Sequence, residues 1–253
     1  MKPEFFRDRI ALFQSEALFR LGTDAMVLAD FARIPRGAAV CDLCAGTGAV
    51  GLLLSAEDPA RRVTAVELQE APCGLLRQAV RRNGLKDRFT VICGDLREHR
   101  SLFAPGSFRC VVCNPPYYPE GAGFAAESEA VAIAKTERCC TLEDVAAASD
   151  WLLQTGGSLD LVHKPERLTD LLCTLRTHGL EPKRLRLVVH KPEAKPSLVL
   201  LRAVKGGKPG LDLQNPLLLQ NPDGTPSAEY RRIYHIPQEG PDRGPSCSPE
   251  VSL

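Results

Sequence analysis

The sequence is poor in aromatic residues and has no surplus of either charge. Its 253 residues include one Trp, 4 Tyr and 9 Phe, and 32 Lys and Arg stand against 31 Asp and Glu, for a net charge of +1. This balance excludes a strongly basic, histone-like nucleic-acid binder, and a hydrophobic share of 44% excludes a disordered chain. No apolar run approaches the roughly 20 residues of a membrane-spanning helix, and the N-terminus has no signal-peptide core. We therefore expect a cytoplasmic protein without a membrane partner.

The 10 cysteines are too few for a disulfide scaffold, in which roughly 8–10% of the residues would be Cys. Two Cys-x-x-Cys spacings, Cys41 with Cys44 and Cys110 with Cys113, together resemble a four-thiolate zinc site. Both pairs lie in short apolar runs typical of strands, in which residues i and i+3 point to opposite faces. We therefore expect no metal and reduced thiols that pack as small hydrophobes.

Strand-like runs alternate with helical segments along most of the chain. The expected strands cover 39–44, 63–67, 89–93, 110–113 and 158–163. The expected helices cover 24–33, 48–56, 70–83 and 165–178, with a further helix that begins at Thr141 as its N-cap. Such alternation is typical of a parallel sheet between two layers of helices. Two last runs, 183–190 and 197–204, have no helix between them and predict an antiparallel hairpin.

These segments predict one α/β domain of three layers, with a mostly parallel sheet of seven strands and a C-terminal antiparallel hairpin. The domain is expected to cover 1–235. The stretch 118–140 has no clear period and predicts a loop. The segment 236–253 is rich in Pro, Gly and Ser and predicts a disordered tail.

A glycine-rich turn follows the first expected strand and opens a helix. Gly46-x-Gly48-x-x-Gly51 satisfies the dinucleotide-binding spacing, and Glu67 ends the next strand. Glycine lets the backbone approach a ligand closely, and the acid can accept hydrogen bonds from ribose hydroxyls. The same spacing also fits a tight strand-to-helix turn that binds no ligand, so it does not identify a site by itself.

Two further acids make the ligand more specific. Asp42 stands shortly before the glycines, four residues ahead of Gly46, and Asp95 follows the third strand. An anion at Asp42 opposes the pyrophosphate of NAD but suits a cation, such as a sulfonium that carries an amino group. Asp95 can accept a hydrogen bond from an adenine amino group. Because Asp42, Glu67 and Asp95 stand at the carboxyl ends of neighbouring strands, where such sheets bind ligands, they favour S-adenosylmethionine (SAM) over NAD.

The motif Asn114-Pro115-Pro116-Tyr117 ends the fourth expected strand. Its prolines stiffen the turn, so that the Asn114 side-chain oxygen and the Pro115 carbonyl can both accept hydrogen bonds from one amino group. Two such acceptors stabilise the positive charge that develops when an adenine amine attacks a methyl group. Tyr117, with Tyr118, offers a face on which the base can stack. The alternative is a proline-rich strand terminator followed by an ordinary surface tyrosine.

In their order and spacing these motifs resemble those class I SAM-dependent methyltransferases that modify exocyclic or amide nitrogens, which share a Rossmann-like domain. Further segments are similar to the tRNA1(Val) N6-adenine methyltransferase group. They are 22–29, 141–144, 162–168, 183–186, 205–207 and the pair Tyr230 and Tyr234. The resemblance implies methyl transfer from SAM to an adenine next to the anticodon of a tRNA, with no obligatory protein partner.

The resemblance also implies roles for individual residues. The implied cofactor site comprises Thr23, Asp24, Asp42, Cys44, Gly46, Gly48, Glu67, Asp95, Leu96 and Asn114. Within it, Thr23 and Asp24 belong to the region that holds the methionine end of the cofactor. Asn114, Pro115 and Tyr117 are the implied catalytic residues, and Pro116 and Tyr118 are implied to contact the substrate.

A basic segment is the candidate RNA-binding surface. Between 164 and 208 there are eleven Lys and Arg but four acids, a surplus that can bind phosphates. Within it, Lys183, Arg184 and Arg186 are the residues expected to contact RNA. The alternative is a solvated face whose lysines guard a sheet edge against aggregation.

Three other functions remain open at this point. A protein glutamine N5-methyltransferase shares the Asn-Pro-Pro-Tyr motif, but such enzymes usually carry an N-terminal helical domain before the segment that begins at Gly22 here. A NAD-dependent oxidoreductase would use the glycine turn and leave Asn114 without a task. A non-catalytic RNA-binding module would keep the fold alone.

Overall fold

The computed structural model describes residues 3–6, 10–15, 18, 21–118, 132–134, 136–137 and 139–237. Its strands are β1 (Glu4–Phe6), β2 (Ile10–Leu12), β3 (Ala39–Leu43), β4 (Arg62–Glu67), β5 (Phe89–Cys93), β6 (Phe108–Cys113), β7 (Leu153–His163), β8 (Leu180–Val189), β9 (Pro196–Lys205), β10 (Asp212–Leu213) and β11 (Leu217–Leu218). Its α-helices are α1 (Thr23–Phe31), α2 (Ala49–Glu57), α3 (Glu70–Arg82), α4 (His99–Leu102), α6 (Leu142–Leu152), α7 (Leu168–Thr177) and α8 (Ala228–Tyr234). Two short 3₁₀ helices, η1 (Leu96–Glu98) and η2 (Pro165–Arg167), follow β5 and β7.

Within the described residues the central sheet has nine strands in the order β10-β8-β9-β7-β6-β3-β4-β5, with β11 also paired to β8. Strands β3 to β7 run parallel to one another, and β9 is antiparallel to both β7 and β8. The carboxyl ends of β3, β4, β5, β6 and β7 therefore meet at one edge, which we call the carboxyl edge. The expected parallel sheet and its antiparallel hairpin are confirmed, and β3–β5 with β6–β9 are the seven expected strands.

The sheet is larger than expected, because β10 and β11 extend it beside β8. Each has two residues, Asp212 with Leu213 and Leu217 with Leu218, and each pairs parallel to β8. Two residues are too few to show the period-2 pattern of a strand, so the sequence carries no signal for them.

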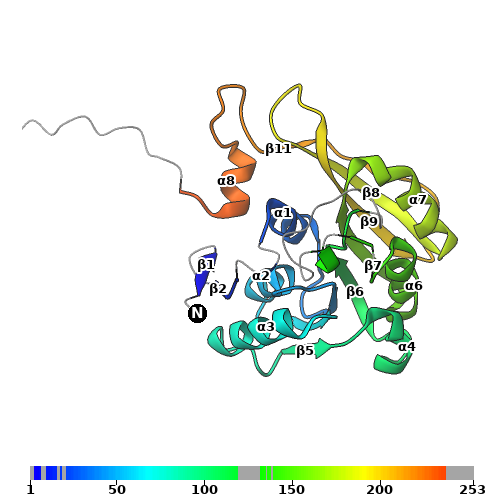
Figure 1. Ribbon diagram of the computed structural model, residues 1–253. Helices are drawn as coiled ribbons and strands as arrows, with labels where there is room; N and C mark the ends of the chain where they lie inside the picture. Colours follow the sequence, from blue (N-terminus) through cyan, green and yellow to red (C-terminus); the bar gives the residue numbers. More distant parts are fainter. Residues whose placement is uncertain are drawn as a thin grey trace, which may run out of the picture.

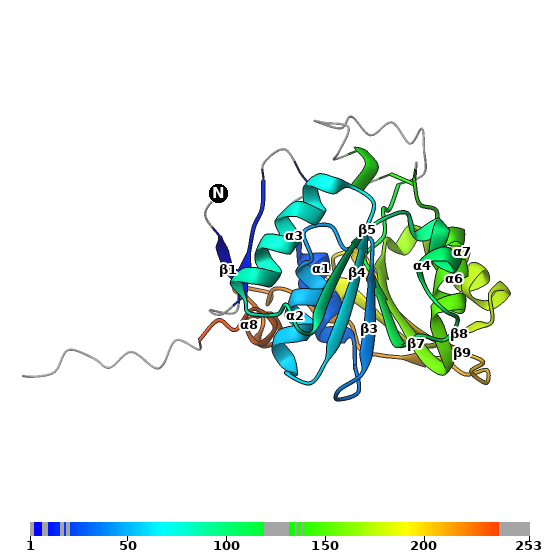
Figure 2. The same ribbon diagram turned by 90° about the horizontal axis from the view of Figure 1, so that it is seen from below.

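Helices cover both faces of the sheet (Figures 1 and 2). On one face α1, α2 and α3 bury Met26, Leu52 and Leu76 against the strands. On the other face α6 and α7 bury Leu152 and Leu171 in a second core. Full burial of each such side chain contributes about 1.5–3 kcal/mol, so the two cores account for the three-layer architecture.

Strand β7 begins five residues before the expected start, at Leu153 instead of Ser158. The Gly156–Gly157 pair lies within the strand, where Gly156 has a φ of +75° and the register with β6 shifts. A Cβ on Gly157 would lie 2.8 Å from a backbone oxygen, that of Gln154. The glycines therefore form an irregularity inside the strand, and the expected strand starts only after them.

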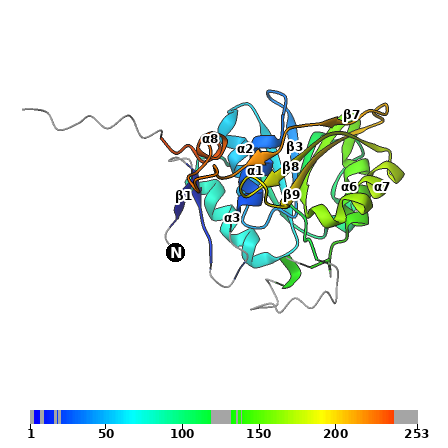
Figure 3. The same ribbon diagram turned by 90° about the horizontal axis from the view of Figure 1, so that it is seen from above.

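Two peripheral elements pack on the α1–α3 side and were not expected (Figures 1 and 3). The β1–β2 hairpin is tied to the end of α3 by Asn83, which accepts a hydrogen bond from the Ala11 amide (2.9 Å) and donates one to its carbonyl (2.7 Å). Helix α8 is tied to α1 by an ion pair between Arg232 and Asp30, with the closest atoms 2.5 Å apart. None of the helices described is long and apolar enough to cross a membrane. The expected tail from 238 on, and most of the expected loop 118–140, lie outside the described residues.

Replacing Gly48 tests how the turn after β3 fits against α3. The φ of Gly48 is +86°, and a Cβ there would lie 2.1 Å from Leu76 Cδ1. Gly84 is a matched control, because its φ is +67° but a Cβ would meet nothing within 4 Å. Gly84→Ala should cost about 1–2 kcal/mol of unfolding free energy for the left-handed backbone. Gly48→Ala should cost about 1–3 kcal/mol more for overpacking, as measured by urea unfolding. Equal losses in the two variants would contradict the close contact with Leu76.

Candidate active site

A cavity of about 320 Å³ opens at the carboxyl edge of the sheet. This volume lies within the roughly 300–1,000 Å³ of typical small-molecule sites. Most of the predicted site residues line it: Asp24, Asp42, Cys44, Gly46, Glu67, Asp95, Leu96, Asn114, Pro115, Pro116, Tyr117 and Tyr118. The structure therefore brings together acids from three strand ends, the glycine turn and the Asn-Pro-Pro-Tyr motif around one hollow.

The glycine turn exposes backbone to the cavity at Gly46. Its φ is +56°, and a Cβ there would meet nothing within 4 Å, so the space beside it is free for a ligand. The Gly46 amide donates a hydrogen bond of 2.8 Å to Glu67, which also accepts one of 2.9 Å from the Gln69 amide. Burial raises the pKa of Glu67. Because a carboxylate has about four acceptor positions, Glu67 can hold the turn and still accept bonds from a ribose.

Asp42 lies beneath the turn and is 1% exposed. Its carboxylate accepts a hydrogen bond of 2.9 Å from the Gly51 amide. Burial, and to a smaller degree the charge of Glu67, raise the pKa of Asp42 to about 7, against the lowering effect of the Gly51 bond. A buried anion of this kind is stabilised by a nearby cation, so the site suits a positively charged ligand better than a phosphate.

Among the described residues the third acid, Asp95, is paired with an arginine, unlike Asp42 and Glu67. Asp95 accepts bonds from the backbone amide of Arg97 (2.9 Å) and from its guanidinium, with the closest atoms 2.5 Å apart. This pairing with Arg97 lowers the pKa of Asp95. An adenine amino group would share the carboxylate with Arg97, so the expected adenine contact stays a prediction. Leu96 beside it is buried and gives the cavity an apolar wall.

The Tyr117 hydroxyl joins the Asn-Pro-Pro-Tyr motif to α1. It lies 2.5 Å from Asn114 Oδ1 and 3.0 Å from Asp24 Oδ2, and its hydrogen can serve one of these oxygens at a time. Burial, followed by the charge of Asp24, raises the pKa of Tyr117. Asp24 is itself held by the Ala25 amide at 2.9 Å. The side-chain amide of Asn114 is therefore fixed in orientation at the edge of the cavity.

The ring of Tyr117 is held from outside the motif. The buried ring of His163 packs against it, with centroids 5.3 Å apart, and Lys164 Nζ lies 5.4 Å from its centroid. Burial lowers the pKa of His163 to about 4. The neutral ring accepts a bond of 2.8 Å from the Lys164 amide. Stacking of a base on Tyr117 stays a prediction.

The cysteines near the cavity are free thiols. Cys44 has a φ of +55°, and its sulfur lies 3.7 Å from that of Cys140, which also lines the cavity. Among the described residues no group of three or more His, Cys, Asp or Glu is arranged to hold a metal ion. Sequence reasoning missed Cys139 and Cys140 as lining residues, because they lie in a stretch without motif or period.

Two predicted cofactor residues do not line the cavity. Thr23 begins α1, and its side chain interacts with Tyr234 of α8. Gly48 packs against Leu76 and supports the turn from behind. Their predicted contact with a cofactor is therefore not supported by their position.

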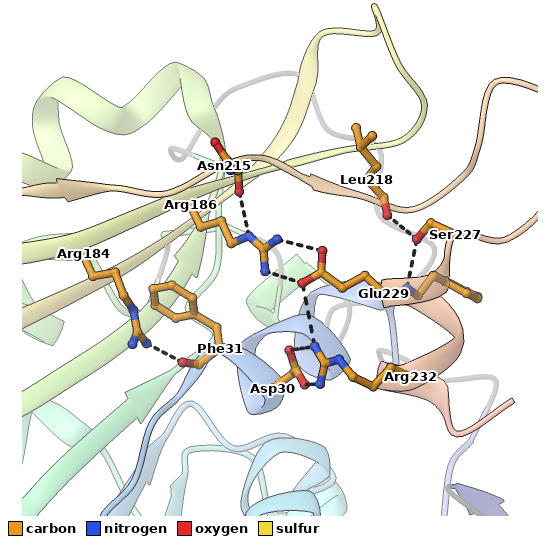
Figure 4. Close-up of polar contacts among 10 residues, drawn as sticks. Asp30, Phe31, Arg184, Arg186, Asn215, Leu218, Ser227, Glu229 and Arg232 are labelled. Carbon is orange, nitrogen blue, oxygen red and sulfur yellow. Dashed lines mark hydrogen bonds and ion pairs between the residues drawn. The ribbon is translucent and has the colours of Figure 1, made fainter.

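The positions of Arg184 and Arg186 do not support the expectation that they contact RNA (Figure 4). Arg184 is 8% exposed, and its guanidinium donates a hydrogen bond to the Phe31 carbonyl. The guanidinium carbon also lies 4.1 Å from the centre of the Phe31 ring. Arg186 forms two hydrogen bonds of 2.7 Å with Glu229. Arg184 thus joins the sheet to α1, and Arg186 joins it to α8. Lys183, whose ammonium donates to a backbone carbonyl 3.0 Å away, lies toward the edge opposite the cavity.

A match to a known protein family identifies the family of this chain. Residues 15–172 match the family model of the methyltransferase small domain. The chain belongs to this family. The prediction of a SAM-dependent methyltransferase is thereby confirmed at the level of family and fold.

Relatives of this methyltransferase differ in how much of the chain they match. A tRNA1(Val) (adenine(37)-N6)-methyltransferase from Aeromonas hydrophila is 27% identical over 85% of this chain and 88% of its own length. A release factor glutamine methyltransferase from Mycolicibacterium smegmatis is 40% identical, but over 36% of this chain and 31% of its own length. Among solved structures, a predicted O-methyltransferase from Agrobacterium tumefaciens superposes with a TM-score of 0.68 at 20% identity, over 84% of this chain and 95% of its own. This likeness shows the fold.

The raised pKa of Asp42 predicts pH-dependent binding of a cationic cofactor. With a pKa of about 7 the carboxyl is mostly protonated at pH 5.5 and half ionised at pH 7. The amino group of SAM stays mostly charged over this range, because α-amino groups titrate near roughly 7.7–8.0. Since the cation binds the ionised form, the affinity for SAM in calorimetry should rise roughly tenfold from pH 5.5 to 7.

Two controls isolate Asp42 in that measurement. The neutral nucleoside 5′-methylthioadenosine lacks the charged amino acid part and should bind with little dependence on pH. Asp42→Asn cannot ionise and should lose the rise in SAM affinity. A rise of equal size in Asp42→Asn would assign the pH dependence to another group.

Proposed function

We propose that this methyltransferase transfers the methyl group of SAM to the N6 amino group of an adenine in the anticodon loop of a tRNA. One observation carries the proposal: the Asn-Pro-Pro-Tyr turn borders the cofactor cavity, with the Asn114 side chain fixed by the Tyr117 hydroxyl at 2.5 Å. Relatives that bear this name match most of the chain, which supports adenine in tRNA as the substrate.

The cofactor, when bound, supplies an electrophilic methyl group on a positively charged sulfur. Gly46 leaves space for it beside the turn, while Asp42 and Glu67 supply the negative charge that a cationic ligand needs. The acids and the turn therefore bind and orient, and they take no proton from the substrate.

Asn114 and Pro115 act on the amino group. The Asn114 side-chain oxygen and the Pro115 carbonyl would each accept one N–H of the adenine amine. Holding both hydrogens favours a pyramidal nitrogen and stabilises the charge that develops on it during attack. A second lone pair on Asn114 Oδ1 remains for this bond while Tyr117 uses the first. A duplex or stacked base must first be turned out of its stack to reach this point.

Glutamine methylation is the second candidate, because a glutamine amide presents a similar planar NH2 group. The partial match to a release factor glutamine methyltransferase favours it for the catalytic core alone. The tRNA-methylating relatives match over more than twice that share of the chain, so we place adenine first.

Asn114→Ala tests the mechanism. The variant should lose more than about a hundredfold of its methyl-transfer rate, because one acceptor for the developing charge is gone. Its affinity for SAM should stay within about twofold of the wild type, because the acids and the turn are unchanged. Activity is measured with labelled SAM and total tRNA, followed by nucleoside analysis.

The same assay distinguishes the substrates and the roles of the motif. Total protein and DNA are incubated in parallel, and label in protein alone would favour glutamine. Tyr117→Phe keeps the ring but frees the Asn114 amide, and should lower the rate less than Asn114→Ala. An Asn114→Ala variant with wild-type activity would refute the proposed mechanism.

A further inference from the structure

The arginines of the basic segment 164–208 all form ion pairs or hydrogen bonds with other groups of the protein. Each has an acidic or carbonyl partner: Arg167 pairs with Glu137 and Asp170, Arg176 with Glu181, Arg184 with the Phe31 carbonyl, Arg186 with Glu229 and Arg202 with Asp160. Figure 4 shows two of these arginines, Arg184 turned toward Phe31 of α1 and Arg186 toward Glu229 of α8. The excess of charge in the sequence is therefore no measure of what the surface offers to RNA.

Three lysines are left over at the carboxyl edge. Within the described part of the chain, Lys164, Lys191 and Lys195 have no acidic partner, and we call these three the lysine edge. Lys164 directly follows β7, and the other two lie in the loop between β8 and β9. Because β9 is antiparallel to β7, with Val199 beside His163, that loop lies at the same end of the sheet as the cavity.

A second hollow lies beside the cavity, with Lys164 of the lysine edge in its wall. It is lined by Tyr117, Tyr118, Lys164, Glu166, Arg167 and Ser197. The two tyrosines and Lys164 line both hollows. Lys164 therefore stands at the passage from the catalytic motif to the outer surface, and Ser197 joins this passage to the β8–β9 loop. Two exposed acids, Glu166 and Glu193, lie nearby and are outnumbered by the lysines.

We propose that the lysine edge binds the phosphates that flank the target adenine, with Lys164 at the phosphate of the target nucleotide itself. The inference rests on the proposed function, since a base held at Asn114 must leave its own phosphates just outside the motif. The second hollow begins there. Lysine binds phosphate as a compact point charge and needs no fixed geometry. It can therefore contact these phosphates whatever the neighbouring bases are.

Lysine-to-glutamine variants of the full chain test this site. Lys164→Gln, and the triple variant with Lys191→Gln and Lys195→Gln, are compared with Lys86→Gln, an exposed lysine before β5 at the opposite edge. We expect Lys164→Gln to lower kcat/KM for tRNA at least fivefold, with unchanged affinity for SAM and unchanged melting temperature. Lys164→Arg should restore most of the loss, because it keeps the charge.

The salt dependence of tRNA binding gives an independent measure. Each phosphate contact to a single strand contributes about 0.7 to the slope of log K against log salt, so the triple variant should reduce the slope by about 2. Wild-type slope and kcat/KM in the triple variant, or an equal loss in Lys86→Gln, would overturn the inference while tRNA methylation by the wild type stands. If the wild type methylates protein and no tRNA, the proposed function fails, and this inference fails with it.

Discussion

The site depends on one short stretch of backbone, from the end of β3 to the first turn of α2, that two buried carboxylates hold in place. Glu67 binds the Gly46 amide and Asp42 binds the Gly51 amide, so both acids shape the turn from below. Those bonds partly offset the cost of burial, but the pKa of Asp42 is still raised to about 7. Because burial raises the pKa of both Asp42 and Glu67, a cation in the cavity would stabilise their ionised forms. The electrostatic cost to the free protein becomes binding energy for a sulfonium and an ammonium group.

The substrate side depends on a different constraint, the hydroxyl of Tyr117. It connects Asp24 of α1 with Asn114 at the end of β6, two segments that are 90 residues apart in the sequence. An amide that rotated freely would accept an N–H bond at an entropic cost in every catalytic cycle. Here that cost is met on folding, because Tyr117 is itself fixed by His163. In the proposed mechanism, the position of the methyl acceptor thus depends on the packing of α1 against the sheet.

Much of this arrangement could be predicted because it follows from local pattern. Parallel strands end at a common edge, so acids and motifs that follow strands must meet, and Thr141 caps α6 as its sequence indicates. What could not be predicted depends on contacts far apart in the chain. Nothing near Thr23 in the sequence shows that its side chain interacts with Tyr234 of α8, and a two-residue strand such as β10 has no pattern of its own. The Gly156–Gly157 pair reads as a turn unless the neighbouring strand is known.

The surplus of Lys and Arg in the segment 164–208 does not show which of these side chains are free to bind RNA, because arginine and lysine behave differently in a fold. Arginine is weakly hydrated and binds carboxylates and carbonyls through a planar fork, so a fold can bury it, as it does Arg184. Lysine is strongly hydrated and tends to keep its ammonium group in water. In the segment 164–208 the arginines accordingly join strands and helices, while Lys164, Lys191 and Lys195 stay exposed or half-exposed at the carboxyl edge. A chain with a net charge of +1 can therefore present a local positive edge beside the Asn-Pro-Pro-Tyr motif. In the proposed function such an edge would steer the RNA to that place instead of binding it over the whole surface.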